Sequence, residues 1–241
     1  MEMNLLNRFQ EEKSMRLKDG LYHQTQIKLA YNTNRIEGSA LSEEQTRYIF
    51  DTNILNVNPN ESVNVDDIIE AVNHFSCFDF MLDVADGNLS EDMIKEFHRI
   101  LKTGTMDSRK EWIKTSDYKT SPNTAGGEET TPPADVSDAM YALLDSYRKT
   151  TPVDLAAIAG FHYRFEKIHP FQDGNGRLGR IILFKECLKN DIVPFIIEDE
   201  LKENYYRGLK EFEKAPDCLI ETCLSAQDKY REILRNFQDG E

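Results

Sequence analysis

The residues best suited to chemistry lie in one stretch of the chain, residues 169–180, which has the sequence HPFQDGNGRLGR. His169 carries an imidazole that titrates near neutral pH and suits a general base. Asp173 carries a carboxylate, whose oxygens are ligands that Mg²⁺ prefers. Two glycines and two arginines follow it. The stretch therefore combines a proton acceptor, a metal ligand and two cations.

The glycines, Gly174 and Gly176, flank Asn175 and favour an anion-binding turn. Glycine readily takes positive φ, so successive backbone N–H groups can point into one concavity. A helix that begins there adds unpaired N–H groups and the positive end of its dipole, which suit phosphate oxygens. Arg177 and Arg180 are three residues apart and so share one helical face above the turn. We expect phosphates on this turn, with Mg²⁺ between them and the preceding carboxylate.

Two other kinds of site compete for the same glycines. Residues 174–179 also fit the G-x-G-x-x-G pattern of dinucleotide-binding oxidoreductases, and an apolar run at 192–197 and acids at 198–200 follow at a suitable distance. That pattern requires a buried strand before its first glycine, whereas the segment here is polar and contains Pro170. The oxidoreductase is therefore the less favoured alternative. An EF-hand calcium loop is excluded because Phe184 occupies its twelfth position.

Residues 169–180 resemble in full the motif H-x-F-x-[D/E]-G-N-G-R-x-x-R of Fic-domain proteins. The resemblance implies an all-α Fic-type helical bundle with a short β-hairpin flap, and transfer of AMP from ATP to a Ser, Thr or Tyr hydroxyl of a protein, self-modification included. It implies that His169 is the catalytic base and that Asp173 holds Mg²⁺. The nucleotide-binding residues that it implies are Asp173, Gly174, Asn175, Gly176, Arg177, Leu178, Gly179 and Arg180. Transfer of UMP or phosphate by the same fold, and a nucleotide-sensing module without turnover, stay open as alternatives.

A second segment points to the same family. Residues 22–37 have a helical pattern that ends at Gly38, a residue suited to positive φ. Glu37 falls in the last turn, where the negative end of the helix dipole disfavours an acid, so a partner elsewhere is expected. The segment from Thr33 to Gly38 resembles the inhibitory motif [S/T]-x-x-x-E-[G/N] of Fic proteins. This resemblance implies that Glu37 pairs with Arg180 and keeps it from the γ-phosphate.

Helical periodicity disappears between residues 103 and 133, a length that suggests a functional loop. Short strands are expected at 110–114 and 118–120, with a turn at 126 and 127. The resemblance implies a flap around residues 110–133 that binds the target protein as an added strand. Its nucleotide-proximal residues would be Asn123, Thr124, Ala125 and Gly126.

Two tyrosines, Tyr205 and Tyr206, resemble the pair that lines the adenine site in the family. Glu213 stands where an asparagine is expected, which leaves base selectivity open. The remaining chain predicts helices at 66–85, 90–102, 136–147, 198–213 and 217–237, and residues 1–19 suggest a short surface helix or a frayed lead. His98 is interpreted as a packing residue. We divide the chain into a helical segment, 1–60, with the inhibitory motif at 33–38, and a Fic core, 61–241.

The composition limits the partners. A formal net charge of −14 argues against nonspecific binding to nucleic acid or to an anionic membrane. The four cysteines show neither C-x-x-C spacing nor a disulfide framework, so reduced thiols are expected. No basic leader and no span long enough for a bilayer is visible, and we expect a cytoplasmic protein. The expected partners are ATP and an unidentified target protein; homodimerisation is implied by the resemblance alone.

Overall fold

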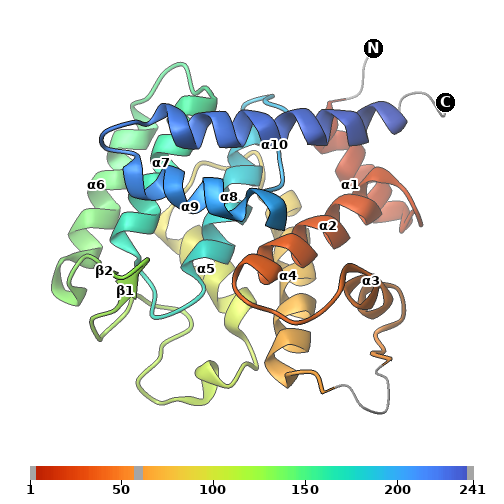
Figure 1. Ribbon diagram of the computed structural model, residues 1–241, viewed down its shortest axis with the longest axis horizontal. Coiled ribbons are helices and arrows are strands. Elements are labelled where there is room, and N and C mark those ends of the chain that lie inside the picture. The colour runs from red at the N-terminus through yellow and green to blue at the C-terminus, as the bar shows by residue number, and fades with distance from the viewer. Residues whose placement is uncertain (1–3, 57–61, 238–241) are drawn as a thin grey trace.

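The protein is a bundle of α-helices with one small β-hairpin, as the sequence predicted (Figure 1). A computed structural model describes residues 4–56 and 62–237. Within these residues there are ten α-helices, three 3₁₀ helices and two strands. The predicted boundary between residues 60 and 61 lies outside the described residues.

The elements follow one another along the chain with short connections. The α-helices are α1 (Leu5–Met15), α2 (Leu21–Ile36), α3 (Glu43–Thr52), α4 (Val65–Asp83), α5 (Glu91–Lys102), α6 (Val136–Arg148), α7 (Leu155–Ile168), α8 (Asn175–Lys189), α9 (Lys202–Glu211) and α10 (Asp217–Asn236). The 3₁₀ helices are η1 (Asp107–Arg109), η2 (Pro133–Asp135) and η3 (Asp199–Leu201), and the strands are β1 (Thr124–Ala125) and β2 (Glu128–Glu129). The predicted helices are confirmed, with ends that shift by a few residues.

Helix α8 forms the centre of the bundle. It contacts α7, α5, α2, α4 and α1, and in Figure 1 it lies behind α9 and α10. Leu178, Ile181 and Phe184 are almost fully buried. Because α8 is enclosed on nearly every side, the residues at its N-terminus are held in fixed positions relative to the neighbouring helices.

The N-terminal helices share this core. Phe9 of α1 is fully buried and makes edge-on contacts with Phe78 of α4 and Phe184 of α8, with ring centroids 6.2 and 6.0 Å apart. Of the two expectations for this segment, the short helix is confirmed as α1; Leu6 and Phe9 anchor it in the core, while Met15 at its end is exposed. Helix α2, which carries Glu37 at its end, is buried along most of its length between α1, α3, α4 and α8.

The segment before α6 differs from its prediction. Strands were expected at 110–114 and 118–120, but the two strands are at 124–125 and 128–129, in antiparallel register with Ala125 opposite Glu128. Gly126 and Gly127 have φ of 57° and 85°, which suits a tight two-residue hairpin turn, so the turn prediction is confirmed. Residues near 118–120 pair instead with the loop before α8, where Lys119 N donates to Pro170 O at 2.9 Å.

Two further observations concern the whole chain. All four cysteines are free thiols. Among the described residues, no helix combines the length and the apolar character needed to cross a membrane.

Candidate active site

The site is built on the connection between two packed helices. Helix α7 ends at Ile168, and the next residue, His169, caps it in a left-handed conformation with φ of 51° and donates its backbone N–H to Phe165 O at 2.9 Å. Gly174 has φ of 82° and precedes the first residue of α8. A helix therefore begins at the glycine-flanked turn, as predicted, and its first N–H groups are available to an anion.

The loop between α7 and α8 is fixed by a buried side chain and by hydrogen bonds within the loop. Phe171 is fully buried, and Asn175 binds its backbone at both ends: Asn175 Oδ1 accepts from Phe171 N and Nδ2 donates to Phe171 O, each at 2.9 Å. The Asn175 side chain is thus engaged in closing the loop. Its backbone N–H belongs to the first turn of α8, and contact of Asn175 with a phosphate stays a prediction.

Asp173 lies between two cations. Its Oδ2 accepts from Lys102 Nζ at 2.5 Å and from Arg177 Nη2 at 3.1 Å. Burial raises the pKa of Asp173, but Arg177 and Lys102 outweigh burial and hold this pKa well below its usual range. The carboxylate is therefore ionised at neutral pH, and its side chain is 44% exposed. Among the described residues, no group of three or more His, Cys, Asp and Glu side chains is gathered as a metal site.

His169 is placed to act as a neutral base. Burial lowers the pKa of its imidazole, the backbone of Glu166 raises it, and the nearby Lys119 lowers it further, with a net downward shift. Its Nδ1 lies 3.8 Å from Glu166 Oε2, and burial raises the pKa of Glu166 to about 8, so that this carboxyl is mostly protonated at neutral pH. The imidazole is consequently unprotonated at pH 7 and can accept a proton.

Glu37 is in direct contact with Arg180. Arg180 Nη2 donates to Glu37 Oε1 at 2.5 Å and to Thr33 O at 3.2 Å. Burial raises the pKa of Glu37, but Arg180 more than compensates and the pKa is lowered. Gly38, with φ of 101°, ends the turn after α2. A Cβ at Gly176 would overlap the Glu37 carboxylate, so the absence of a side chain there makes room for the acid.

Comparison with known proteins identifies the family of this site. The family model described as "Fic/DOC family" matches residues 88–186, which include α5, the hairpin and most of α8. The matched range of this chain contains the whole motif at residues 169–180 and resembles a Fic domain. Proteins named "Protein adenylyltransferase fic-1" from Caenorhabditis elegans and Caenorhabditis briggsae are each 28% identical to it over 198 residues, 78% of this chain and 37% of theirs. The chain therefore spans little more than a third of the length of these curated relatives.

Solved structures support the same fold. A Fic-domain-containing signalling protein from Bacteroides thetaiotaomicron has a TM-score of 0.69 and 22% identity, with 94% of this chain and 97% of that chain covered. A Fic family protein from Desulfovibrio desulfuricans has a TM-score of 0.70 and 25% identity, with 97% and 74% covered. The all-α Fic fold predicted from the sequence is thus confirmed.

Two residues of the Fic motif do not face the turn. Leu178 is fully buried in the core, and its N–H donates to Gly174 O at 3.1 Å within the helix. A Cβ at Gly179 would lie 2.5 Å from Glu166 Oε1, so this glycine allows α8 to approach α7 closely. Both residues therefore serve helix packing, and nucleotide binding by Leu178 and Gly179 stays a prediction.

The two tyrosines have different surroundings. Tyr205 is buried; its hydroxyl lies 2.7 Å from His162 Nε2 and accepts from Arg180 Nη1 at 3.5 Å. Tyr206 is 43% exposed, and its hydroxyl donates to Ile36 O at 3.4 Å, beside the end of α2. Tyr205 thus helps to hold Arg180, whereas Tyr206 has a face open to a ligand.

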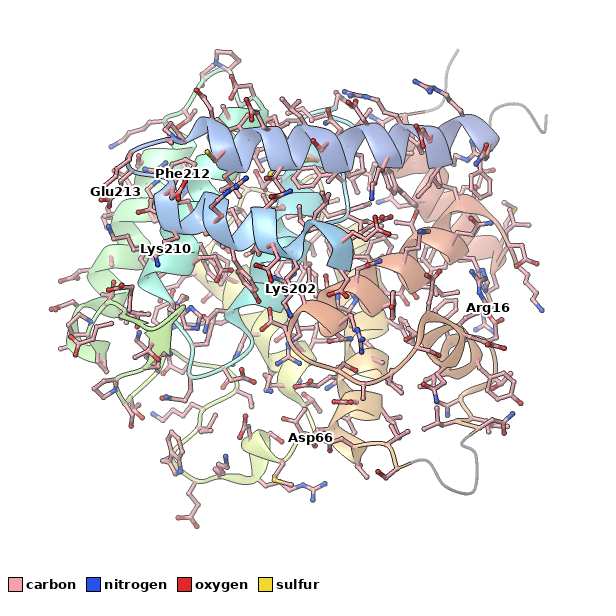
Figure 2. All side chains as sticks on the ribbon, viewed as in Figure 1. Arg16, Asp66, Lys202, Lys210, Phe212 and Glu213 are labelled. Carbon is pink, nitrogen blue, oxygen red and sulfur yellow. The ribbon has the colours of Figure 1, made fainter. Side chains whose placement is uncertain are left out.

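Glu213, at the position where the family is expected to have asparagine, follows α9 and is labelled in Figure 2. It accepts from the Tyr163 hydroxyl at 3.0 Å and pairs with Lys167, both on α7. The preceding Phe212 stacks on the Tyr163 ring at 4.3 Å between centroids. In this structure Glu213 therefore ties α9 to α7.

The β-hairpin is joined to the motif loop by Asn123, the residue directly before β1. Asn123 Nδ2 donates to Phe171 O at 2.9 Å, and Asn123 Oδ1 accepts from Lys119 Nζ at 2.7 Å. Thr124 and Ala125 pair with β2, and Gly126 lies in the turn. Of the four predicted flap residues, the structure thus joins Asn123 directly to the motif loop and places the other three in the hairpin beyond it.

Three residues of the site were not found by sequence reasoning. His98, interpreted as packing, stacks on Phe171 at 3.8 Å with an interplanar angle of 9°, and its Nε2 lies 2.9 Å from Asp173 O. Lys102 binds Asp173, and Glu70 pairs with Arg177. These residues come from α5 and α4, and only the packing of those helices on α8 brings them to the motif. A lysine in the last turn of a helix gives no signal of its own, because cations are common there.

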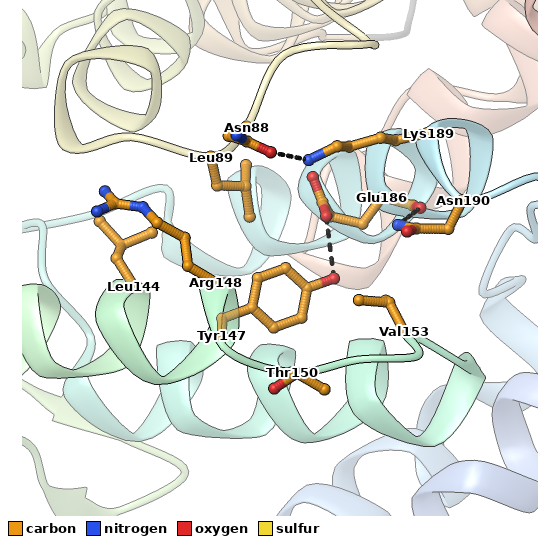
Figure 3. Close-up of a pocket in the computed structure, with 10 residues that line it drawn as sticks. All are labelled: Asn88, Leu89, Leu144, Tyr147, Arg148, Thr150, Val153, Glu186, Lys189 and Asn190. Atoms are coloured by element: carbon orange, nitrogen blue, oxygen red, sulfur yellow. Dashed lines mark hydrogen bonds between the residues drawn. The ribbon is translucent and has the colours of Figure 1, made fainter.

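A separate cavity of about 300 Å³ lies between α6 and the C-terminal half of α8 (Figure 3). Its buried carboxylate, Glu186, accepts from the Tyr147 hydroxyl at 2.9 Å and from Lys185 Nζ at 2.8 Å, and Lys189 donates to Asn88. These polar groups satisfy one another. The cavity contains no residue of the Fic motif, so the motif turn is the better nucleotide site. The oxidoreductase alternative also loses its support, because helix α7 and an irregular loop lead directly to Gly174 where a strand is required, and residues 192–197 form no strand.

Proposed function

We propose that this chain is a protein adenylyltransferase that transfers AMP from ATP to a Ser, Thr or Tyr hydroxyl of a protein and is held inactive by Glu37. The observation that carries the proposal is the shared position of His169, the anion-binding helix start and the Arg180–Glu37 pair around one loop. The names of the related proteins support the same activity. Binding of the target along the hairpin, self-modification and homodimerisation belong to the proposal and rest on the family resemblance.

The site fits one Mg²⁺ ion carried by a nucleotide. Asp173 is an ionised, partly exposed carboxylate and the sole acidic ligand of the motif, which suits an ion that keeps most of its coordination sphere for water and phosphate. When bound, Mg²⁺ would neutralise charge on the phosphates. The N–H groups at the start of α8 would bind phosphate oxygens, with Arg177 at the inner phosphates and Arg180 at the γ-phosphate.

His169 would perform the proton transfer. Its neutral imidazole takes the proton of the incoming hydroxyl as the hydroxyl oxygen bonds to the α-phosphorus. The bond between the α-phosphorus and the bridging oxygen to the β-phosphate breaks, and pyrophosphate leaves with the electron pair. The arginines and helix N–H groups stabilise the charge that develops on pyrophosphate.

Glu37 would inhibit by competition. A guanidinium that is bound to a carboxylate cannot also hold the γ-phosphate, and Arg180 is only 3% exposed in its pair with Glu37. The nucleotide would then bind without its outer phosphate in place. Removal of Glu37 should restore the productive arrangement.

The test uses ATP labelled at the α-phosphate. Glu37→Gly should increase label transfer to protein, and Glu37→Gly/His169→Ala should reduce it by about 10²–10⁴-fold, the usual contribution of a general base. Intact mass should show addition of one adenylyl group when the chain modifies itself. Unchanged labelling in the single variant would remove the inhibitory role of Glu37, and retained labelling in the double variant would remove His169 as the base.

A second candidate function keeps the site and changes the transferred group. Glu213 replaces the expected asparagine near the adenine side of the site, which favours a test of base selectivity. Parallel reactions of the Glu37→Gly variant with α-labelled ATP and UTP, and with γ-labelled ATP, separate AMP, UMP and phosphate transfer. A variant that binds ATP but releases no pyrophosphate would instead indicate a nucleotide-sensing module.

A further inference from the structure

Lys102, the last residue of α5, is a buried cation at the metal-binding carboxylate. It is 2% exposed, and its Nζ lies 2.5 Å from Asp173 Oδ2, 2.9 Å from Glu70 Oε1 and 3.9 Å from Asp107 Oδ2. An unpaired ammonium in such a place would be strongly unfavourable, so these carboxylates keep it there. The ammonium therefore contacts Oδ2 of Asp173, one of the two oxygens that this carboxylate could offer to a divalent cation.

Lys102 belongs to a cycle of four charges joined by short ion pairs, and the more distant Asp107 has its own partner, Lys110. Glu70 Oε2 pairs with Arg177 Nη1, and Asp173 Oδ2 accepts from both Arg177 and Lys102. Two cations thus alternate with two carboxylates, and the group is neutral as a whole. The side chains of Lys102 and Arg177 are 3% and 5% exposed, and that of Asp173 is the most exposed of the four at 44%.

This balance disfavours a divalent ion that arrives alone. Such an ion would add two positive charges beside Lys102 and Arg177, whose own charges are already neutralised by Glu70 and Asp173. Repulsion between charges a few ångströms apart is strong where water is scarce. The phosphates of a nucleotide bring the missing negative charge, so an ion that arrives with them meets no such excess.

We propose that Lys102 is a positioning residue that holds Asp173 in place of a divalent cation and makes metal binding depend on nucleotide. The inference rests on the proposed function, because it assigns to Asp173 the role of metal ligand in nucleotidyl transfer. The proposed effect of Lys102 is electrostatic. Removal of its ammonium leaves the other three side chains with one net negative charge, so that Asp173 can bind a free divalent ion.

The experiment measures binding of Mn²⁺ alone to the full chain, by the electron paramagnetic resonance signal of free Mn²⁺. Lys102→Met should bind Mn²⁺ about tenfold more tightly than the unmodified chain, because one nearby positive charge has been removed. Lys102→Arg keeps the charge and should bind as weakly as the unmodified chain. Lys95→Met is the matched control, since Lys95 is on the same helix and pairs with Glu91 and Asp117 away from the motif.

Several outcomes would overturn the inference. Equal Mn²⁺ affinity of a folded Lys102→Met variant would do so, as would an equal gain in Lys102→Arg or in Lys95→Met. Lys102→Gln replaces the methionine variant if the latter fails to fold, as judged by circular dichroism. The proposed function is tested separately: AMP transfer by Glu37→Gly with no Mn²⁺ effect in the Lys102 variants refutes this inference alone. Tighter Mn²⁺ binding with no AMP transfer refutes the activity alone.

Discussion

The two arginines of the motif are held by carboxylates in different ways. Arg180 pairs with Glu37, a residue just beyond the end of α2 whose side chain is 32% exposed and has one cationic partner. Arg177 pairs with Glu70, which lies inside α4, is 16% exposed and also binds Lys102. Loss of the first contact frees one arginine, whereas loss of the second leaves two buried cations short of a partner. The comparison suggests that Glu37 forms a releasable contact and Glu70 a structural one.

The largest expected effect is on stability. Glu70→Ala should lower the free energy of unfolding by about 3–5 kcal/mol, the usual result of removing one partner from a buried ion pair. Glu37→Ala should lower it by about 1 kcal/mol or less, because this carboxylate is partly exposed and Arg180 keeps its hydrogen bonds to Thr33 O and the Tyr205 hydroxyl. Urea denaturation of both variants measures the difference. Equal losses would mean that the two contacts do not differ in kind.

The second expected effect is on the rate of AMP transfer. It separates the contribution of the Glu37 charge to inhibition from that of the Glu37 side-chain volume. Glu37→Gly should raise AMP transfer by at least about tenfold, equivalent to about 1.4 kcal/mol. Glu37→Gln removes the charge but keeps the side chain over Gly176, so it should give a smaller increase. Initial rates of label transfer at saturating ATP provide the measurement. An equal rate for the two variants would show that charge alone inhibits.

A smaller effect is expected from pH. The folded pKa of Glu37 is lowered by Arg180, so its contribution to stability is present at neutral pH and is lost as the pH falls through the folded value. The stability difference between the unmodified chain and Glu37→Gln should therefore shrink below pH about 4, near the ordinary glutamate pKa. Thermal unfolding between pH 3 and 7, as approximate limits, measures it. A difference that grows on acidification would contradict the lowered pKa.

The rate of AMP transfer should depend on pH through a different group, His169. Burial lowers the pKa of His169, so its imidazole stays neutral below the ordinary value of about 6.5. AMP transfer by the Glu37→Gly variant should be nearly constant from pH 8 to about 6.5 and fall only in more acidic buffer. The pH profile of the initial rate tests this, and a midpoint above pH about 7 would exclude the proposed state of the histidine.

The sequence was informative where a pattern is local. The helix start at Gly174 follows from glycines beside apolar helical spacing, and Glu37 stood out because an acid ends a helix whose dipole disfavours it. Both features are complete within a few residues, and the structure contains both. Long, periodic helices were predictable for the same reason.

The parts of the site that the sequence did not predict depend on contacts between residues far apart in the chain. Glu70 is 107 residues away from its partner Arg177, and Lys102 is 71 residues away from Asp173; these pairs form only because α4 and α5 pack on α8. The strands predicted near 110–120 do not form, since Lys119 bonds to the motif loop. Leu178 was assigned to the nucleotide by its place in a motif, whereas its orientation on α8 directs it into the core.

The space between the Gly176 backbone and the Glu37 carboxylate is very small. Since even a methyl group there would collide with the carboxylate of Glu37, the same small volume cannot hold that acid and a phosphate oxygen together. Dissolved salt weakens attraction between charges but does not create space. If Glu37 inhibits as proposed, high ionic strength alone should therefore not activate the chain, because the block would be steric as well as electrostatic.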